Sequence, residues 1–198
     1  MKITGATFAG SSTRVNQRPS RRLPEFAFIG RSNVGKSSLI NMLCDNAKLA
    51  MTSATPGKTK LVNHFLINDS WYLVDLPGYG YAKLNREGRD ELKAVISDYI
   101  NNSEELICLF VLIDSRHDIG NIDLDFIREL GEHGVPFSII FTKTDKIGPN
   151  VLKAQVERDC AILSEEWEQL PEMFLSSSQA KKGRDEILTY IENILKTL

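Results

Sequence analysis

The 198-residue sequence has only three cysteines, no long apolar run and no internal repeat. Cys44, Cys108 and Cys160 are odd in number and lack C-x-x-C spacing, so we expect buried, reduced thiols, with a metal-binding or catalytic thiol as the alternative. The longest apolar run, Leu106–Ile113, has eight residues, whereas a membrane span needs about 20. No apolar stretch follows Lys2, so we expect neither a secretory signal nor a membrane anchor.

The composition is that of a globular chain, with 42% hydrophobic and 25% charged residues, and it excludes disordered, collagen-like and coiled-coil proteins. The net charge of −2 conceals an asymmetry, because residues 1–60 carry ten lysines and arginines but only two acidic residues. This predicts an anionic ligand or partner on the basic side. We interpret residues 1–23 as a basic N-terminal extension and residues 24–198 as one domain, and we expect a monomer. Four arginines of the extension have no acidic neighbours in the sequence: Arg14, Arg18, Arg21 and Arg22.

Apolar strand patterns and helix patterns alternate after Pro24. We expect strands at 25–29, 61–67, 71–75, 106–113, 136–141 and 173–175, and a short one at 3–8. We expect helices at 36–44, 86–101, 123–131, 150–167 and 184–195. The Ser-, Arg- and Pro-containing stretch 10–24 is expected to be a linker or mobile arm, and residues 46–60 a loop. The alternation predicts a three-layer α/β fold with a mostly parallel sheet, and the hairpin at residues 68–70 predicts one antiparallel edge strand.

The sequence GRSNVGKS at residues 30–37 matches the phosphate-binding loop pattern G-x-x-x-x-G-K-[ST], with a strand before it and a helix after it. Glycines allow backbone N–H groups to surround phosphate oxygens, and the helix N-terminus adds partial positive charge. We expect Lys36 to reach the β- and γ-phosphates and the Ser37 hydroxyl to bind Mg²⁺; a chance glycine-rich turn is the alternative. The residues assigned to this loop are Gly30, Arg31, Ser32, Asn33, Val34, Gly35, Lys36, Ser37 and Ser38.

A D-x-x-G motif begins at Asp75, the last residue of the expected strand 71–75. A carboxylate there can hold Mg²⁺ through water. The Gly78 N–H can contact the γ-phosphate, because glycine has no side chain to block the approach. The pattern alone is also typical of a turn, but its position at a strand end favours nucleotide binding. The residues assigned here are Asp75, Leu76, Pro77 and Gly78.

The loop 46–60 lies between the first helix and the hairpin. A threonine hydroxyl in this loop can give Mg²⁺ a second ligand when the γ-phosphate is present. We favour Thr59 over Thr52 and Thr55, because Gly57 lets the loop bend toward the phosphates. The loop residues assigned to nucleotide binding are Gly57, Lys58 and Thr59.

The tetrapeptide Thr-Lys-Thr-Asp follows the expected strand 136–141. The Asp145 carboxylate can accept two N–H bonds from the guanine edge, which adenine cannot supply, and the stem of Lys143 can lie over the base. The usual pattern begins with Asn, so Thr142 lacks an amide. Backbone N–H groups of the serines after strand 173–175 can contact the guanine O6; the alternatives are a plain surface turn and a serine loop. The residues assigned to the base are Thr142, Lys143, Thr144, Asp145, Leu175, Ser176 and Ser177.

These motifs occur in the order of the small GTPase domain, each at a strand end. Over residues 24–195 the chain also resembles the EngB (YihA/YsxC) family of ribosome-biogenesis GTP-binding proteins, whose use of Thr at position 142 it shares. The resemblance implies GTP hydrolysis to GDP, Mg²⁺, a cytoplasmic location and action on the assembling large ribosomal subunit, where an rRNA contact is consistent with the basic first third. The segments that carry it are Gly30–Ser38 (GRSNVGKSS), Thr55–Thr59 (TPGKT), Asp75–Lys83 (DLPGYGYAK), Asp114–His117 (DSRH) and Thr142–Lys146 (TKTDK).

Tyr79 stands where signalling GTPases carry the Gln that orients the attacking water, so we expect slow intrinsic turnover. The direction of Arg31, the arginine of the phosphate loop, cannot be read from the sequence. The side-chain oxygen of Asn33 can hold K⁺ near the β–γ bridge; alternatively Asn33 only caps the loop, or the ribosome supplies the missing group. The residues assigned to catalysis are Lys36, Thr59, Gly78 and Asn33.

Two other functions fit parts of the pattern. One is a guanine-nucleotide switch that acts on a protein or membrane effector without RNA contact. The other is a phosphotransferase or ATPase, against which the Thr142–Asp145 motif argues. The three histidines show no metal-ligand spacing, and we expect packing or solvent-exposed roles for His64, His117 and His133.

Overall fold

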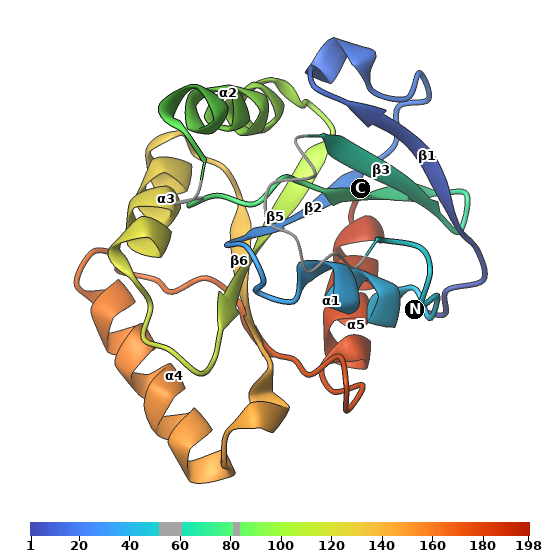
Figure 1. Ribbon diagram of the computed structural model, residues 1–198. Coiled ribbons are helices and arrows are strands. Elements are labelled where there is room, and N and C mark those ends of the chain that lie inside the picture. The colour runs from blue at the N-terminus through green and yellow to red at the C-terminus, as the bar shows by residue number, and fades with distance from the viewer. Residues whose placement is uncertain (52–60, 81–83) are drawn as a thin grey trace.

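A computed structural model describes residues 1–51, 61–80 and 84–198 (Figure 1). Seven strands form one sheet in the order β1–β3–β4–β2–β5–β6–β7. The strands are β1 (Ala6–Ser12), β2 (Glu25–Gly30), β3 (Val62–Ile67), β4 (Trp71–Asp75), β5 (Leu106–Asp114), β6 (Phe137–Thr142) and β7 (Met173–Leu175). The helices are η1 (Val15–Gln17), α1 (Lys36–Leu43), α2 (Arg86–Asn102), α3 (Asn121–Glu132), η2 (Thr144–Lys146), α4 (Pro149–Ser164) and α5 (Arg184–Leu195), of which η1 and η2 are short 3₁₀-helices.

Strand β3 is antiparallel to both of its neighbours, β1 and β4, and the other neighbouring pairs are parallel. The hairpin between β3 and β4 turns at Asn68 and Asp69, whose φ values of 50° and 53° are left-handed. Asn and Asp adopt this conformation more readily than most residues, which fits them to a tight hairpin turn. The predicted α/β class with a mostly parallel sheet and an antiparallel strand is confirmed. The antiparallel strand of the hairpin, β3, is not itself the edge, because β1 pairs with its outer side.

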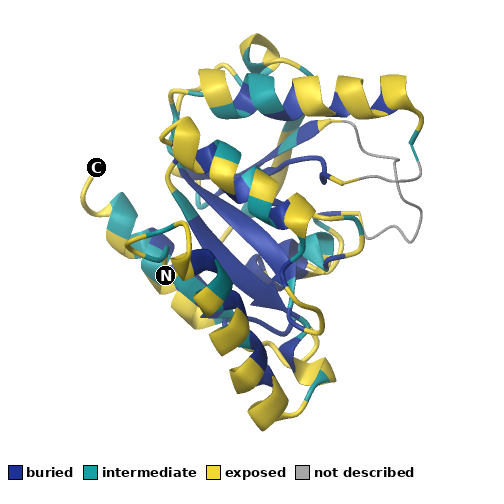
Figure 2. Ribbon diagram, turned by 90° about the vertical axis from the view of Figure 1, so that its left-hand side faces the viewer, coloured by how far each residue is buried: buried dark blue, intermediate teal, exposed yellow. Residues whose placement is uncertain are grey.

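Helices cover both faces of the sheet, with α1 and α5 on one face and α2, α3 and α4 on the other (Figure 1). Strand β2 is buried on both sides, because Phe26 and Phe28 face α1 and α5 while Ala27 and Ile29 face the other layer. Figure 2 shows the buried sheet between helices whose outer faces are exposed. This burial explains why the parallel strands are nearly continuous apolar runs in the sequence.

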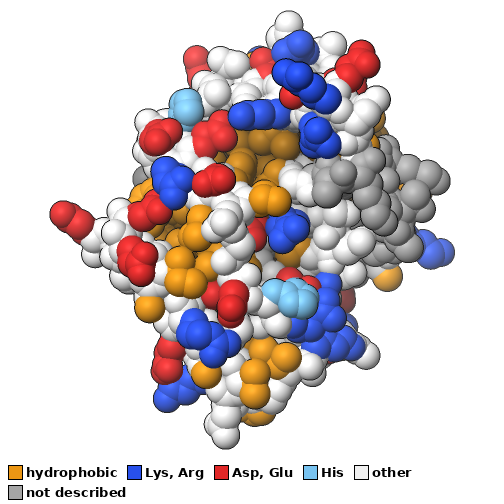
Figure 3. Space-filling model, turned by 60° about the vertical axis from the view of Figure 1, so that its left-hand side comes forward, with side chains coloured by type: hydrophobic (Ala, Val, Ile, Leu, Met, Phe, Trp, Pro, Cys, Tyr) orange, Lys and Arg blue, Asp and Glu red, His pale blue; other side chains and the backbone are white. Residues whose placement is uncertain are grey.

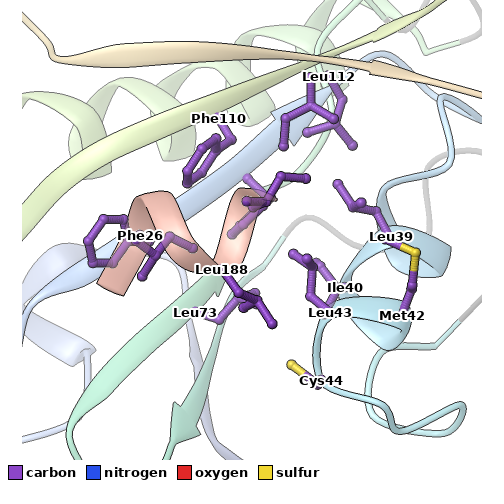
Figure 4. Packing of buried hydrophobic residues seen from close by; sticks show 14 of the residues in the cluster. Phe26, Leu39, Ile40, Met42, Leu43, Cys44, Leu73, Phe110, Leu112 and Leu188 are labelled. Carbon is purple, nitrogen blue, oxygen red and sulfur yellow. The ribbon is translucent and has the colours of Figure 1, made fainter. Parts of the chain in front are cut away.

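The core beside α1 fixes that helix against the sheet. Leu39 and Ile40 of α1 are fully buried and belong to the same apolar cluster as Leu188 of α5 (Figure 4). In this cluster the Phe28 and Phe110 rings stack with centroids 4.8 Å apart. Burying each such side chain stabilises the fold by about 2 kcal/mol. The packing therefore holds the start of α1 at the carboxyl end of β2.

The short strand expected at 3–8 is longer and lies later in the chain, at Ala6–Ser12. It pairs with β3 along Ala6↔Ile67 to Ser12↔Val62, and Phe8 meets Phe65 edge to face at 5.9 Å. The expectation of a linker or mobile arm over 10–24 is wrong for residues 10–12. These residues form a strand because the edge of β3, far away in the sequence, provides partners for their backbone. The boundary that we expect at residue 24 remains a prediction.

The arginines of residues 1–23 have acidic partners that the sequence does not place near them. Arg18 is the most enclosed, with a 7% exposed side chain that also donates to Ser103 Oγ at 2.7 Å. The basic charge of this segment is therefore partly neutralised within the fold. The ion pairs are Arg14–Asp98 at 3.9 Å, Arg18–Glu105 at 2.5 Å, Arg21–Asp69 at 2.5 Å and Arg22–Glu105 at 3.7 Å.

The helix expected at 150–167 ends at Ser164. Trp167 instead packs edge to face on Phe137 of β6, with ring centroids 5.2 Å apart. A Cβ atom on Gly131 of α3 would lie 2.3 Å from this indole. The helix therefore ends before Trp167, whose indole enters the apolar layer. Gly131 leaves room for this indole because it has no side chain.

Candidate nucleotide-binding site

The motifs that the sequence singles out lie at the carboxyl ends of neighbouring strands. β2 leads into the phosphate loop, β4 ends at Asp75, and β6 ends at Thr142. Since β4, β2, β5 and β6 are adjacent and parallel, these ends share one edge of the sheet. In open α/β sheets this edge is where ligands bind.

The phosphate loop requires glycine at two places. A Cβ on Gly30 would lie 2.8 Å from Val34 Cγ1 and 3.0 Å from the Leu112 carbonyl oxygen, so the loop leaves β2 in close contact with β5. Gly35 has φ 101° and directly precedes α1. Because glycine has no side chain to accept the first N–H groups of α1, these groups are available to an anion. Asn33 is also left-handed, with φ 62°, a conformation that Asn tolerates.

Lys36 and Asp75 meet beside this loop. The Lys36 ammonium contacts an Asp75 carboxylate oxygen, and both side chains are largely buried. Burial lowers the pKa of Lys36 to about 7. An enclosed ammonium of this kind is stabilised by a nearby anion, and a phosphate group is one. The structure therefore brings together two of the predicted nucleotide ligands from separate elements.

The donor set at this point fits Mg²⁺. Asp75 supplies a carboxylate, and Ser37, the second residue of α1, supplies a hydroxyl. Hard oxygen ligands of this type are those that Mg²⁺ prefers, together with phosphate oxygens and water. The loop residues Gly57, Lys58 and Thr59 lie outside the described residues, and so do the rivals Thr52 and Thr55.

Backbone hydrogen bonds hold the D-x-x-G segment against the phosphate loop. The Leu76 N–H donates to the Phe28 carbonyl at 3.0 Å, and the Tyr79 N–H donates to the Gly30 carbonyl at 3.1 Å. Leu76, Pro77 and Gly78 lie between these two bonds and are buried. Gly78 is thus held next to the phosphate loop, and the predicted contact of its N–H with the γ-phosphate stays a prediction.

The side chain of Tyr79 points into the α3 layer. Its hydroxyl donates to Asp123 Oδ1 at 2.8 Å, and its ring stacks on Phe126 with centroids 4.5 Å apart. Only 8% of the residue is exposed, and burial next to the Asp123 carboxylate holds the pKa of the phenol well above 10. A tyrosine held in this way cannot perform the water-orienting role of the Gln found at this position in signalling GTPases.

Arg31 lies on the same side as the backbone after Tyr79. Atoms of its side chain come within 3.6 Å of a Cβ built on Gly80 and within 3.9 Å of one built on Gly120. The Arg31 side chain, whose direction the sequence does not show, therefore points toward the turn before α3. Nothing in these contacts assigns Arg31 a catalytic role.

Two side chains of the base motif are bonded to the phosphate loop. The Thr142 hydroxyl donates to the Val34 carbonyl at 2.6 Å, and the Lys143 ammonium donates to the Asn33 carbonyl at 2.6 Å. Thr142 thus keeps a polar link to the phosphate loop although it lacks the amide of the usual Asn. These bonds fix the end of β6 relative to the loop that carries Lys36.

Asp114 is a site residue that the motif analysis left without a role. It ends β5, accepts from Lys143 Nζ at 3.0 Å and forms an ion pair with Arg116 at 2.8 Å. Hydrogen bonds from Arg116 and Lys143 outweigh its partial burial and hold the pKa of this carboxyl well below its usual range. Two features of the sequence could have indicated that Asp114 belongs to the site. It ends the strand beside β6, and it is the first residue of the DSRH segment.

Asp145 is held in place by Ser177. The Ser177 hydroxyl donates to Asp145 Oδ1 at 2.7 Å and, as the main cause, lowers the pKa of that carboxyl. Thr144 also ties the two loops together, since its hydroxyl donates to the Ser176 carbonyl at 3.1 Å. The carboxylate is therefore charged at neutral pH and oriented by a neighbouring side chain.

The serine loop differs from the expectation in one respect. The Ser176 N–H donates to the Phe141 carbonyl at 2.8 Å, and the Ser177 N–H donates to the Lys182 carbonyl at 3.1 Å. Both groups are used within the chain, so of the three serines Ser178 is the one whose N–H is left for the expected contact with the guanine O6, among the described hydrogen bonds. That contact stays a prediction. The bond from Ser176 to Phe141 continues the parallel pairing of β7 with β6. Sequence motifs do not reveal which backbone N–H groups are used in this way. Leu175, Ser176 and Ser177 lie beside the base motif nevertheless.

The fold and the site together define a class. A strand, a glycine-containing phosphate loop and a helix carry a buried lysine, the next parallel strand ends in a carboxylate, and a Lys-x-Asp motif is anchored to the same loop. This combination is that of a P-loop GTPase domain.

Comparisons with known proteins agree with this class. The sequence family described as "50S ribosome-binding GTPase" matches residues 25–143. The probable GTP-binding protein EngB of Bacteroides thetaiotaomicron is 59% identical, over 99% of this chain and 97% of the relative. That of Christiangramia forsetii is 53% identical, over 98% of both chains. The chain belongs to the EngB family of GTP-binding proteins.

Solved structures show the same fold. A probable GTP-binding protein EngB superimposes with a TM-score of 0.68 at 24% identity, covering 88% of this chain and 100% of that one. Era from Aquifex aeolicus gives a TM-score of 0.67 at 22% identity, covering 90% of this chain and 57% of Era. Within the described residues no helix has both the length and the apolar character needed to cross a membrane.

Proposed function

We propose that the protein binds GTP with Mg²⁺, hydrolyses it to GDP and phosphate, and acts as a switch in assembly of the large ribosomal subunit in the cytoplasm. The observation that carries the proposal is the link between the two halves of the site. Lys143 bonds to the Asn33 carbonyl of the phosphate loop, while Asp145 two residues later is oriented by Ser177. One rigid unit can therefore hold both the base and the phosphates of a guanine nucleotide.

Each part of the site has a defined task in this proposal. Lys36 neutralises charge on the β- and γ-phosphates, the first N–H groups of α1 bind phosphate oxygens, and the Gly78 N–H meets the γ-phosphate. Ser37, Asp75 and Thr59 would hold Mg²⁺. When bound, Mg²⁺ supplies positive charge that stabilises the charge developing on the phosphates. Asp145 accepts hydrogen bonds from the guanine edge, and Lys143 lies against the base.

Hydrolysis by the isolated protein is expected to be slow and to be faster with K⁺. Tyr79 is bonded to Asp123 and does not reach the reaction, so another group must offset charge between the β- and γ-phosphates. Asn33, left-handed in the phosphate loop, is the candidate K⁺ ligand. GTP turnover measured in KCl should exceed that in NaCl at equal ionic strength by about tenfold or more, and Asn33→Ala should remove the difference. Equal turnover in both salts would exclude the cation and favour an activator on the ribosome.

The ribosomal partner is supported by the description of the family and by the remaining positive charge of residues 1–23. Arg14, Arg21 and Arg22 keep side chains that are at least half exposed, whereas Arg18 is enclosed by its ion pair. Exposed arginines can add a phosphate contact, but Arg18 cannot do so without leaving Glu105 unpaired. We therefore place the rRNA contact on the three exposed arginines.

The experiment that tests this partner is co-sedimentation with large ribosomal subunits and their precursors. The triple variant R14Q/R21Q/R22Q should lose association by about tenfold and show a weaker salt dependence, while its GTP affinity stays unchanged. A matched control is K153Q/K181Q/K196Q, which removes three exposed lysines elsewhere. Normal association of the arginine variant, or equal loss in the control, would argue for a protein effector without RNA contact at this segment.

A further inference from the structure

An apolar groove lies between α2 and α3, outside the nucleotide site. Its volume is about 300 Å³, and Tyr79 and Gly80 are among the residues that line it. Figure 3 shows the hollow in its upper half, with an apolar floor between acidic side chains on one side and basic side chains on the other. None of the nucleotide-binding assignments uses these side chains.

Two apolar ridges form the walls of the groove. Both ridges follow the spacing i, i+4, i+8, so each extends along about two helical turns, or roughly 12 Å. A groove of this length accepts three side chains at positions i, i+3 or i+4, and i+7 of a helix. The ridges are Leu92, Ile96 and Ile100 on α2, and Ile122, Phe126 and Leu130 on α3.

The two rims carry opposite charge. Arg89 and Lys93 of α2 line one rim, and Asp125 and Glu129 of α3 line the other. Arg89 donates to the Leu84 carbonyl at 2.6 Å and Asp125 pairs with Arg128 at 2.9 Å. In the described part of the chain, the side chains of Lys93 and Glu129 have no hydrogen bond or ion pair. Each rim therefore offers at least one charge that a ligand can pair with.

We propose that this groove binds one amphipathic helix of a partner protein, with an apolar stripe flanked by acidic residues on one side and basic residues on the other. The apolar stripe fills the space between the ridges, and the acidic flank faces Lys93 while the basic flank faces Glu129. A helix bound there also contacts Tyr79 and Gly80, which directly follow Gly78. The groove is thus an effector surface next to the D-x-x-G segment.

Designed peptides test the charge pattern directly. Three peptides of about 18 residues, long enough to form helix in solution, share one leucine stripe and differ only in their flanks. The first has glutamate on one flank and lysine on the other, the second has glutamate on both, and the third has lysine on both. Fluorescence anisotropy with the full chain should give the mixed-flank peptide an affinity about fivefold higher than either of the others.

Charge variants of the protein should change this preference in a defined way. Lys93→Glu replaces a cation of the α2 rim with a carboxylate beside Arg89, so the all-lysine peptide should gain affinity relative to the mixed-flank peptide. Glu129→Lys replaces an anion of the α3 rim with an ammonium beside Asp125, so the all-glutamate peptide should gain affinity relative to the mixed-flank peptide. Unchanged relative affinities of the peptides in both variants would overturn the assignment of the groove as the binding site.

An apolar variant tests the location. Ile122 is 45% exposed on a groove ridge, and Val151 is 57% exposed on α4, away from it. Ile122→Glu should weaken binding of the mixed-flank peptide by about tenfold, and Val151→Glu should not. No binding of any peptide, or equal loss in both variants, would overturn the proposal. So would a dimer of the native protein in sedimentation that Ile122→Glu dissociates, because a second copy of this chain would then be the occupant.

Discussion

Asp145→Asn should weaken GTP binding by about 3 kcal/mol, roughly a hundredfold, and should improve binding of xanthosine triphosphate. The substitution replaces an acceptor with an amide whose N–H groups face the guanine N–H pair, so buried polar groups are left unpaired. Xanthine presents a carbonyl where guanine has its amino group, and the Asn amide can donate to it. Isothermal titration with both nucleotides in Mg²⁺ measures the two affinities.

Two further variants test whether the effect depends on the position and orientation of the Asp145 carboxylate. Ser177→Ala removes the hydroxyl that donates to Asp145 Oδ1 at 2.7 Å and should weaken GTP binding by about tenfold without improving xanthosine triphosphate. Asp185→Asn changes an exposed carboxyl at the start of α5 and should change neither affinity. If Asp145→Asn bound GTP as tightly as the native protein, the assignment of the base site would be wrong.

Lys36→Ala should reduce GTP turnover by about a thousandfold. Among the described residues, the Lys36 ammonium is the buried cation of the phosphate loop that contacts Asp75, which we propose as a Mg²⁺ ligand. Its loss removes charge stabilisation that is largest in the transition state, where negative charge develops on the phosphates. Single-turnover hydrolysis at saturating protein separates this effect from weaker binding.

Folding and nucleotide binding must be measured separately for this variant. Asp75 loses its partner in Lys36→Ala, so the variant's melting temperature without nucleotide should be compared with that of the native protein. GTP should raise the melting temperature of the native protein and raise that of the variant much less. Lys48→Ala, at an exposed position after α1, is the control. Near-native turnover in Lys36→Ala would show that the loop does not hold the phosphates.

The elements of the fold follow closely from local patterns in the sequence. β7 and α5 have the predicted bounds, because apolar periodicity and the glycine before α5 mark them. The edge strand β1 was misplaced because its stability comes from pairing with β3, at least 50 residues away. Partners such as Glu105 for Arg18 are likewise invisible to local patterns.

In the site, too, local sequence patterns predict the positions of residues but not their contacts with distant elements. Motif spacing places Asp75 at the end of a strand, and Lys36 and Asp145 in the segments that follow strands, since these positions depend only on the order of strands and loops. It does not give side-chain direction, which depends on contacts between distant elements. Tyr79 turns toward Asp123, and Lys143 toward Asp114, because the packing of α3 and β5 places a carboxylate within reach.

The central claim, that the site is built for guanine nucleotides, is tested most directly by titrating the native protein with GTP and ATP in Mg²⁺ under identical conditions. The oriented carboxylate of Asp145 would be left unpaired by adenine, so GTP should bind at least about a hundredfold more tightly than ATP. Only GTP should be hydrolysed at a measurable rate. Equal affinities for the two nucleotides, or faster hydrolysis of ATP, would contradict the account.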